Sequence, residues 1–407
     1  MFIKKRKSLI LLFIVLLIIF ISVSFYFLQI LNDESEVRSY VRKIEDEIIR
    51  KLPAIRKKYA KRISNSSLDA FLTNIKTFTA FTNNEPLWEE AKSWVSKTQL
   101  YDYASSDLGN VLHALKTARI IKADIDTRGT QLKLLLTLQG QQQAIFKPKW
   151  YPVEKIINGP VYGGKDRYGS EILAFYLSGI LRKPLTAPST ERNISLKDDI
   201  VPVATKRLLK TIFDYKSVKC VYGRCFYCKK EDPVCEDETK NLLGAIILNI
   251  NASFQNNRSP WQRTYRTGKF AQWEVREDYC GIVRDKVTTD RLLDLIDASI
   301  FDFLIQNGDR HHYETLDGNV MLLDNGKGLG NPYVHHFDIL APLYQCCIIR
   351  TSTWKRLTEL SGGLLKEMLV SIPNVLNYVT QLHLDAIEHR LYFVYATVEF
   401  CRDKNKV

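Results

Sequence analysis

Residues 307–326 read NGDRHHYETLDGNVMLLDNG and contain the two carboxylates that decide which fold we expect. Asp309 opens the polar run DRHHYE, and Asp324 follows the apolar run VMLL, which predicts a short strand. Kinases place a catalytic base on a loop after a helix and a metal ligand just past a strand. The alternative is an exposed loop followed by a hairpin. The two interpretations differ in whether the rest of the chain supplies the other parts of a kinase.

The composition bounds the class of protein without identifying a function. The chain has 407 residues, of which 45% are hydrophobic and 25% charged, as in a globular protein large enough for two lobes. Its formal net charge of +13 favours anionic partners such as nucleotides, acidic glycans or a lipid surface. The charge does not choose among these partners.

The N-terminus predicts a membrane anchor. The segment MFIKKRK precedes residues 8–28, which carry no charge and are long enough to span a bilayer as a helix. No A-x-A-like cleavage site follows, which favours a signal anchor over a cleaved signal peptide. The basic flank then places residues 32–407 in the lumen or outside the cell, as in a single-pass type II protein of the secretory pathway. This topology argues against nucleic acid as a partner.

The cysteines agree with an oxidising compartment. All eight lie on the predicted luminal side. The segment CVYGRCFYCKKEDPVC is too polar to be stabilised by burial, and nested bridges 220–235 and 225–228 would stabilise it instead. A zinc site built from Cys225 and Cys228 with His311 and His312 is the alternative. Four N-x-Ser sequons, at Asn65, Asn193, Asn251 and Asn257, are compatible with a luminal glycoprotein.

Residues 32–107 are expected to form a helical stem and extension. Apolar residues recur at positions 37, 41, 44, 48 and 52 with helical spacing, and we expect this helix to end at Pro53. A further short helix is predicted over residues 88–95.

Residues 108–148 have the pattern of a kinase small lobe. The segment LGNVLHALKTA is helical, RIIKADID and QLKLLLTLQ alternate across a TRGT turn, and QAIFKP is a third short run. Gln131 and Lys133 point away from the leucine face of the second run. Lys147 lies near the end of the third strand, where kinases place a lysine that bonds the nucleotide phosphates. A surface lysine at a strand end is the alternative.

The elements that follow fit the two-lobed pattern. KDRYGSEILAFYLSGIL predicts a buried helix with Glu171 at its start and Asp166 just before it, although acidic residues at this position can also serve only as helix caps. GAIILNI (244–250) predicts a buried strand linking two lobes. The helix 291–307 is expected to end at Asn307-Gly308, so Asp309 emerges from a rigid element. Residues 338–402 are helical with an apolar lining, as in an α-rich large lobe.

These parts meet the needs of phosphoryl transfer from a nucleotide. Lys147 would bind phosphates, Asp166 and Asp324 a divalent metal, and Asp309 would accept the proton of an acceptor hydroxyl, with Arg310 and His311 positioning phosphate or substrate. The chain departs from ordinary protein kinases, since it has no G-x-G-x-x-G loop and no H-R-D, and DNG stands in place of D-F-G. Glu314 occupies the position of their metal-binding asparagine. The spacing therefore predicts a divergent kinase-like enzyme.

Six separated blocks over residues 105–402 resemble the secretory-pathway kinases related to the Golgi casein kinase. They are GTQLKLLLTLQGQQQAIFKPK, DRYGSEILAFYL, CVYGRCFYCKKEDPVC, FDFLIQNGDRHHYE, LLDNGKGLGNP and APLYQCCIIRTSTWKRL. The resemblance implies an α+β, bilobal, atypical protein-kinase-like fold with a small β-containing lobe and an α-rich large lobe. It also implies ATP with Mn2+ or Mg2+ as cofactors, and bridges that join Cys280 and Cys401 to the Cys346–Cys347 pair.

The resemblance also assigns roles to site residues. Asp309 matches the catalytic aspartate, and Asp166 and Asp324 match the metal ligands. The positions that match nucleotide-binding residues are Gln131, Lys133, Lys147, Glu171, Ile247, Leu248, Asn249, Ile250, Glu314 and Asp324. The expected divisions are residues 1–31 for the cytoplasmic tail and anchor, 32–107 for the stem, 108–246 for the small lobe with its cysteine-rich insertion, and 247–407 for the large lobe.

Within this family, the short C-x-x-C and the CCIIRTSTW block resemble the sugar-kinase branch. That branch phosphorylates the 2-hydroxyl of xylose in the proteoglycan linkage region, so the expected acceptor is a Gal-Xyl oligosaccharide and the expected location is the Golgi membrane. A secreted-protein serine kinase and a non-catalytic relative that activates another kinase are the alternatives. The retained Lys147, Asp309 and Asp324 count against a non-catalytic relative. Trp261 and Tyr265 are candidates for sugar contact, with core or rim packing as the alternative, and the oligomeric state stays open.

Overall fold

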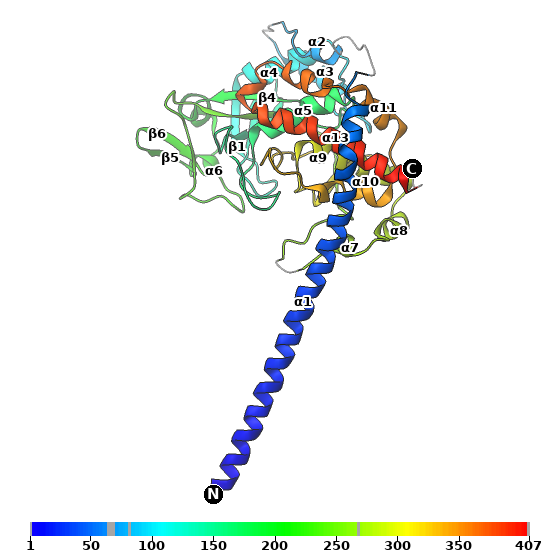
Figure 1. Ribbon diagram of the computed structural model, residues 1–407. Helices are drawn as coiled ribbons and strands as arrows, with labels where there is room; N and C mark the ends of the chain where they lie inside the picture. The colour runs from blue at the N-terminus through cyan, green and yellow to red at the C-terminus, as the bar shows by residue number, and fades with distance from the viewer. Residues whose placement is uncertain (1, 63–69, 80–82, 267–268, 405–407) are drawn as a thin grey trace.

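The computed structural model describes residues 2–62, 70–79, 83–266 and 269–404, without the side chains of 2–12 and 26–40. A mixed body of sheets and helices carries a long helix, α1 (Phe2–Lys58), that runs out of it toward the N-terminus (Figure 1). Within the described part of the chain, no helix has both the length and the apolar character needed to cross a membrane. The predicted anchor, residues 8–28, lies partly outside the described side chains, and the sequon at Asn65 lies outside the described residues.

The small lobe is built on a five-stranded antiparallel sheet in the order β1-β2-β3-β8-β4. Its strands are β1 (Ile120–Ile125), β2 (Leu134–Leu138), β3 (Gln143–Pro148), β4 (Ser189–Ile194) and β8 (Leu242–Leu248). The three antiparallel strands predicted from alternation are confirmed, and the leucines at 132, 134, 136 and 138 are all buried. The run predicted to link two lobes is the buried strand β8, which crosses the expected division at 246/247.

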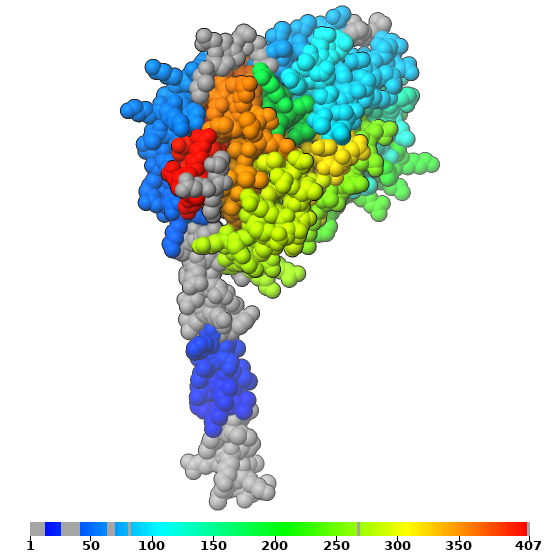
Figure 2. Space-filling view, turned by 90° about the vertical axis from the view of Figure 1, so that its right-hand side faces the viewer, coloured from blue at the N-terminus to red at the C-terminus, as the bar shows by residue number. Residues whose placement is uncertain are grey.

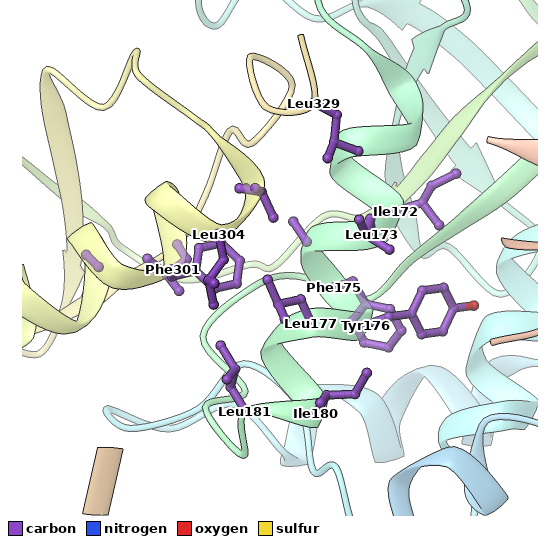
Figure 3. Close-up of a cluster of buried hydrophobic side chains, with 14 of the residues drawn as sticks. Ile172, Leu173, Phe175, Tyr176, Leu177, Ile180, Leu181, Phe301, Leu304 and Leu329 are labelled. Atoms are coloured by element: carbon purple, nitrogen blue, oxygen red, sulfur yellow. The ribbon is translucent and has the colours of Figure 1, made fainter. Parts of the chain in front are cut away.

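Helix α5 (Tyr168–Ile180) is the central buried element, since every one of its residues is buried. Its side chains point on one side toward Phe301 and Leu304 of α9 (Thr289–Ile305) and toward Leu329 (Figure 3). On its other side the helix packs against β8 and β4. Helices α2 (Ala70–Asn74), α3 (Glu85–Ser93) and α4 (Leu108–Thr117) lie N-terminal to the sheet.

A small disulfide-stapled sheet projects from the body beside β1 (Figure 1). It consists of β5 (Ile212–Tyr215), β6 (Val218–Val221) and β7 (Val234–Cys235), and the short helices η1 (Leu196–Ile200), η2 (Val201–Val203) and α6 (Lys206–Leu209) precede it. The bridges Cys220–Cys235 and Cys225–Cys228 are both present, as expected. Because Cys225 and Cys228 are paired with each other, the zinc alternative is wrong.

The large lobe is mostly helical and carries a second small sheet, β9 (Gln255–Arg258), β10 (His312–Leu316) and β11 (Asn319–Met321). Its helices are α7 (Gln272–Val275), α8 (Tyr279–Arg284), α9, η3 (Phe337–Leu340), α10 (Ala341–Cys346), α11 (Thr351–Glu359), α12 (Leu364–Val370), η4 (Val375–Asn377) and α13 (Gln381–Asp403). The bridges Cys280–Cys346 and Cys347–Cys401 join α8 and α13 to the end of α10, as the resemblance implied.

The expected end of the first helix at Pro53 is wrong, because α1 continues to Lys58. Pro53 lies on the exposed face, and the residue whose carbonyl loses its hydrogen-bond donor, Ile49, is also exposed. Leu52 and Ile55 are buried on either side of the proline. Their packing against the body holds the helix together past the missing bond.

Candidate active site

Every residue predicted to act in catalysis, nucleotide binding or metal binding lines one cleft between the five-stranded sheet and the hairpin β10–β11, with a cavity volume of about 530 Å3. These residues are Gln131, Lys133, Lys147, Asp166, Glu171, Ile247, Leu248, Asn249, Ile250, Asp309, Glu314 and Asp324. They come from β3, α5, β8 and β10, from the loop between β1 and β2, from the segment just before α5, and from the loops that follow β8, α9 and β11. The fold thus gathers them from both lobes.

The ammonium of Lys147 is the meeting point of three carboxylates. Lys147 lies on β3, paired with Ala245 of β8, and is buried. Its Nζ is 3.1 Å from Asp166 Oδ2 and 2.5 Å from Glu171 Oε1. The same Nζ donates to Asp324 Oδ1. Burial alone would lower the pKa of Lys147, but the carboxylates of Asp324, Glu171 and Asp166 raise it well above its ordinary value, so the lysine stays charged.

Asp324 approaches this lysine from a strained backbone position. Its φ is +53°, in the left-handed region that few non-glycine residues adopt and that is common at functional sites. Lys133, whose Nζ is 3.6 Å from Asp324 Oδ2, and Lys147 lower the pKa of this carboxyl. Asp324 is therefore ionised at neutral pH.

Asp166 lies against the same loop because Gly326 has no side chain. A Cβ at Gly326 would come within 2.8 Å of the Asp166 carboxyl group. Within the described residues no three His, Cys, Asp or Glu side chains form a ready metal cage. Two carboxylates that leave the remaining positions to water and phosphate are the usual way in which proteins hold Mg2+ beside a nucleotide. The pair Asp166 and Asp324 fits such a cation.

Asp309 is held on a short loop directly after the buried helix α9. The helix does not end at Asn307-Gly308 as predicted, because the left-handed residue that terminates it is Gln306, with φ +61°. Gly308 is required for a different reason, since a Cβ there would lie 2.1 Å from Cγ1 of Val161. The close approach of the 161 segment fixes the path of the loop that carries Asp309.

Two side chains contact the Asp309 carboxylate from the large lobe. The Tyr265 hydroxyl donates to Asp309 Oδ1 at 2.9 Å, and burial together with this carboxylate raises the pKa of Tyr265. His311 Nδ1 lies 3.6 Å from the same oxygen, and Asp309 raises the pKa of the imidazole. Trp261, the other proposed sugar contact, is instead buried and donates its indole N–H to Gln345 at 2.8 Å.

Arg310 ties the two aspartate loops together and is not free to bind substrate. Its guanidinium pairs with the buried Asp302 at 2.6 Å and 2.9 Å. It also donates to the carbonyl of Leu323 and to Asn325 Oδ1, each at 2.7 Å. The residues on either side of Asp324 are therefore braced by the residue next to Asp309, which fixes the relative position of the two aspartates.

The loop between β1 and β2 carries the predicted residues Gln131 and Lys133, but sequence reasoning missed Arg128 and Gly129 on the same loop, which also line the cleft. Gly129 has φ +75°, and a Cβ there would come 3.0 Å from Lys133 Nζ and 3.9 Å from Asp324 Oδ2. Arg128 pairs with Asp126 at 2.6 Å and donates to Asn249 Oδ1 at 3.2 Å. The signal was present in the TRGT turn, since kinases cover the nucleotide phosphates with a glycine-containing loop at this point of the small lobe.

Lys327 and Glu314 complete the charged lining. Lys327 was not predicted, and its Nζ lies 3.8 Å from Asp166 Oδ1. Glu314 faces the cleft from β10, and burial raises the pKa of its carboxyl group. The cleft thus combines lysines that suit phosphate groups with carboxylates that suit a divalent cation.

Known proteins resemble this chain over most of its length. The family described as "Golgi casein kinase, C-terminal, Fam20" matches residues 86–407. The Drosophila melanogaster glycosaminoglycan xylosylkinase homolog is 42% identical over 390 residues, which cover 93% of this chain and 92% of the relative. The Homo sapiens glycosaminoglycan xylosylkinase is 44% identical over 333 residues, or 78% of this chain and 80% of the relative.

Solved structures show the same fold. A hydra Fam20 structure with sugar superimposes with a TM-score of 0.75 at 38% identity, and covers 78% of this chain and 96% of that one. The Golgi casein kinase with Mn/ADP bound gives a TM-score of 0.72 at 27% identity over 88% of this chain and 90% of that one. The α+β, bilobal kinase-like fold expected from the sequence is confirmed, and the chain belongs to the Fam20 family.

Proposed function

We propose that this chain is a kinase that transfers the γ-phosphate of ATP to the 2-hydroxyl of xylose in the proteoglycan linkage region. One observation supports the kinase reaction above others: Lys147 with its three carboxylates and Asp309 line the same cleft. The choice of xylose as acceptor rests on the relatives named xylosylkinase, which are 42% and 44% identical to this chain.

When bound, ATP supplies the transferable phosphoryl group, and Mn2+ or Mg2+ neutralises charge on its phosphates. Asp166 and Asp324 are the proposed metal ligands. Lys147 binds the phosphate oxygens and is itself oriented by Glu171. Gln131, Lys133 and Glu314 line the space around the nucleotide, and the strand end Ile247, Leu248, Asn249 and Ile250 borders the adenine.

Asp309 is the proposed base. Its carboxylate would orient the acceptor hydroxyl and accept the proton from that oxygen as the oxygen bonds to the γ-phosphorus and the bond from this phosphorus to the departing ADP oxygen breaks. The hydrogen bond from Tyr265 holds one carboxylate oxygen in place, which makes the other oxygen the proposed proton acceptor. Lys327, beside Asp166, adds positive charge on the side of the cleft where negative charge develops on the transferred group.

We propose further that the protein resides in the Golgi membrane as a single-pass type II protein with residues 32–407 in the lumen. The basic flank and apolar stretch at the N-terminus support this location. The four disulfides support an oxidising compartment.

The test is a transfer assay with the full chain, ATP, Mn2+, a Gal-Xyl glycoside and acidic serine peptides. We expect phosphorylated disaccharide, and a loss of about 10²- to 10⁴-fold in kcat for Asp309→Ala. Labelled serine peptides without labelled disaccharide would overturn the sugar assignment. Activity that persists in Asp309→Ala would show that the base is another residue or that the activity belongs to a contaminant.

A further inference from the structure

The stapled sheet of β5, β6 and β7 packs one face on the body and leaves the other face in solvent. Side chains alternate between the two faces along a strand, so Phe213 and Tyr215 of β5 share one face and Ile212 lies on the other. Val221, which is paired with Ile212, is fully buried in the core. Tyr215 on the opposite face is 52% exposed. The solvent face of an antiparallel sheet is usually polar, so aromatic rings on this one need a reason outside the core.

Two lysines lie over the rings of this solvent face. Lys216 Nζ is 5.3 Å from the centroid of the Tyr215 ring, and Lys230 Nζ is 5.6 Å from the centroid of the Phe213 ring. Both lysines are exposed. In the described part of the chain, no carboxylate pairs with either ammonium group. We call Phe213, Tyr215, Lys216 and Lys230 the lysine–aromatic face.

The backbone presents Lys216 at a position that lysine rarely occupies. The hairpin between β5 and β6 turns through Lys216 and Ser217, with φ of +45° and +70°. Two-residue hairpins with positive φ favour Asn-Gly or Asp-Gly, because most other side chains are strained in this region. A lysine at the tip of such a turn favours a role for its charge over a role in forming the turn.

The segment around the face carries a large share of the positive charge of the chain. Residues 206–230 contain eight lysines and arginines and a single acidic residue, Asp214, which gives them +7 of the formal net charge of +13. Lys219 pairs with Asp214 at 2.8 Å, on the side of the sheet that faces the body. Asp232, in the acidic segment that follows, pairs with Lys165 of the body at 2.8 Å. The lysines of the solvent face are therefore available to an anionic partner.

This combination of side chains suits an acidic polysaccharide. Lysine ammonium groups form charge-assisted hydrogen bonds with anionic oxygens, and the flat faces of aromatic rings pack against the C–H faces of sugar rings. A lipid surface fits less well, because the stapled sheet lies on the body, away from the N-terminal end of α1 (Figure 1).

We propose that the lysine–aromatic face binds an acidic polysaccharide, of the class that carries sulfate and uronic acid groups, at a site separate from the phosphoryl-transfer cleft. None of the four residues that define the face lines that cleft. The proposal goes beyond the proposed function, and only the choice of a polysaccharide as partner rests on the luminal location proposed above. The face is a binding surface and takes no part in proton transfer.

The test measures the binding of a fluorescent heparin octasaccharide to the full chain in nonionic detergent at about 0.15 M salt. We expect Lys216→Glu combined with Lys230→Glu to raise Kd by about tenfold or more, and Tyr215→Ala to raise it about threefold. The matched control combines Lys97→Glu with Lys116→Glu, which reverses two exposed lysines outside the sheet. It changes the net charge equally and should shift Kd by less than about twofold. Both double variants should keep kcat and KM for transfer to Gal-Xyl, which shows that they are folded.

Three results would overturn the proposal. One is wild type that does not bind heparin, and another is an equal loss in the two double variants, which would mean attraction by net charge alone. The third is a poly-glutamate peptide that binds more tightly than heparin while Tyr215→Ala has no effect, which would assign the face to an acidic peptide.

The design keeps folding and kinase activity separate from binding. If the charge-reversed face variant loses transfer activity, Lys216→Gln combined with Lys230→Gln takes its place, and a Kd equal to that of wild type would contradict the proposal. Binding is measured without ATP or acceptor. A failure of the proposed kinase reaction therefore leaves the heparin result unchanged, and a failure of heparin binding leaves the kinase assignment unchanged.

Discussion

At the scale of single residues, Lys147 is the position at which stability and the proposed activity depend on the same contacts. Replacing it by methionine leaves the buried carboxylates of Asp166 and Glu171 without their cation. Breaking a buried ion pair on one side costs about 3–5 kcal/mol, so we expect Lys147→Met to lower the free energy of unfolding by that amount and to abolish phosphoryl transfer. Urea unfolding and the transfer assay measure the two effects.

A surface lysine provides the control for this prediction. Lys92 pairs with Glu89 at 2.6 Å on the exposed side of α3, and such a pair contributes less than about 1 kcal/mol. Equal destabilisation by Lys92→Met and Lys147→Met would show that the buried cluster contributes no more to the free energy of unfolding than an exposed ion pair.

His383 makes stability depend on pH. Burial, and secondarily the Arg390 guanidinium, lowers the pKa of His383 to about 4. In the unfolded chain its pKa is about 6.5, so below that pH the unfolded state binds a proton that the native state does not bind. The free energy of unfolding is therefore unaffected above pH 6.5 and falls by about 3 kcal/mol as the pH drops to 4.

Urea unfolding at pH 7, 5.5 and 4.5 measures this dependence. His383→Gln should have a shallower acid slope than wild type, because the titrating group is gone. His335 and His336 have pKa values lowered in the same direction by burial, so part of the slope should remain in the variant. Identical slopes for the two proteins would contradict the assignment to His383.

At the scale of elements, α5 is positioned by a glycine. Gly169 lies in its first turn, and a Cβ there would come 2.0 Å from the carbonyl oxygen of Tyr378. Alanine in a helix is favoured over glycine by about 1 kcal/mol, but a clash with a backbone atom costs about 1–3 kcal/mol or more. The clash should outweigh the gain in helix propensity. We therefore expect Gly169→Ala to lower Tm and, by moving Glu171, to reduce kcat.

Gly281 of α8 is the matched position, because a Cβ there meets nothing within 4 Å. Gly281→Ala should leave activity unchanged and stabilise the protein by up to about 1 kcal/mol. If both alanines stabilise, α5 tolerates the shift and its placement does not depend on Gly169.

The elements with strong periodicity could be predicted from the sequence, while contacts across the fold could not. Strands β1 to β3 and the helices α5 and α9 follow from alternation and helical spacing, and these elements carry Lys147, Glu171 and the start of the Asp309 loop. The hydrogen bond between Tyr265 and Asp309 joins segments with no shared pattern. The end of α1 was misplaced because tertiary packing outweighed the local effect of Pro53. The family resemblance, not spacing, supplied the roles of Glu314 and of the strand end 247–250.

At the scale of the whole molecule, the C-terminal part of the first helix is docked on the kinase body. The C-terminal part of α1 packs along α13, so the last residues of the described chain lie beside this part of α1 (Figure 2). Tyr59 stacks on Tyr395 with centroids 4.3 Å apart, and Lys51 pairs with Asp403. The Cys347–Cys401 bridge in turn fixes α13 to the end of α10. Because α1 is docked in this way, the cleft has a set orientation relative to the N-terminal part of the helix.

The docking of α1 can be tested with two neighbouring isoleucines. Ile48 is fully buried, whereas Ile49 is exposed on the same turn. Aspartate at position 48 places an unpaired charge in the interface and removes an apolar contribution of about 1.5–3 kcal/mol, so Ile48→Asp should lower Tm by about 5–10 °C. Ile49→Asp adds the same charge in water and should leave Tm within about 1 °C of wild type. If α1 were a free linker, the two variants would melt together, because neither position would be covered by the body.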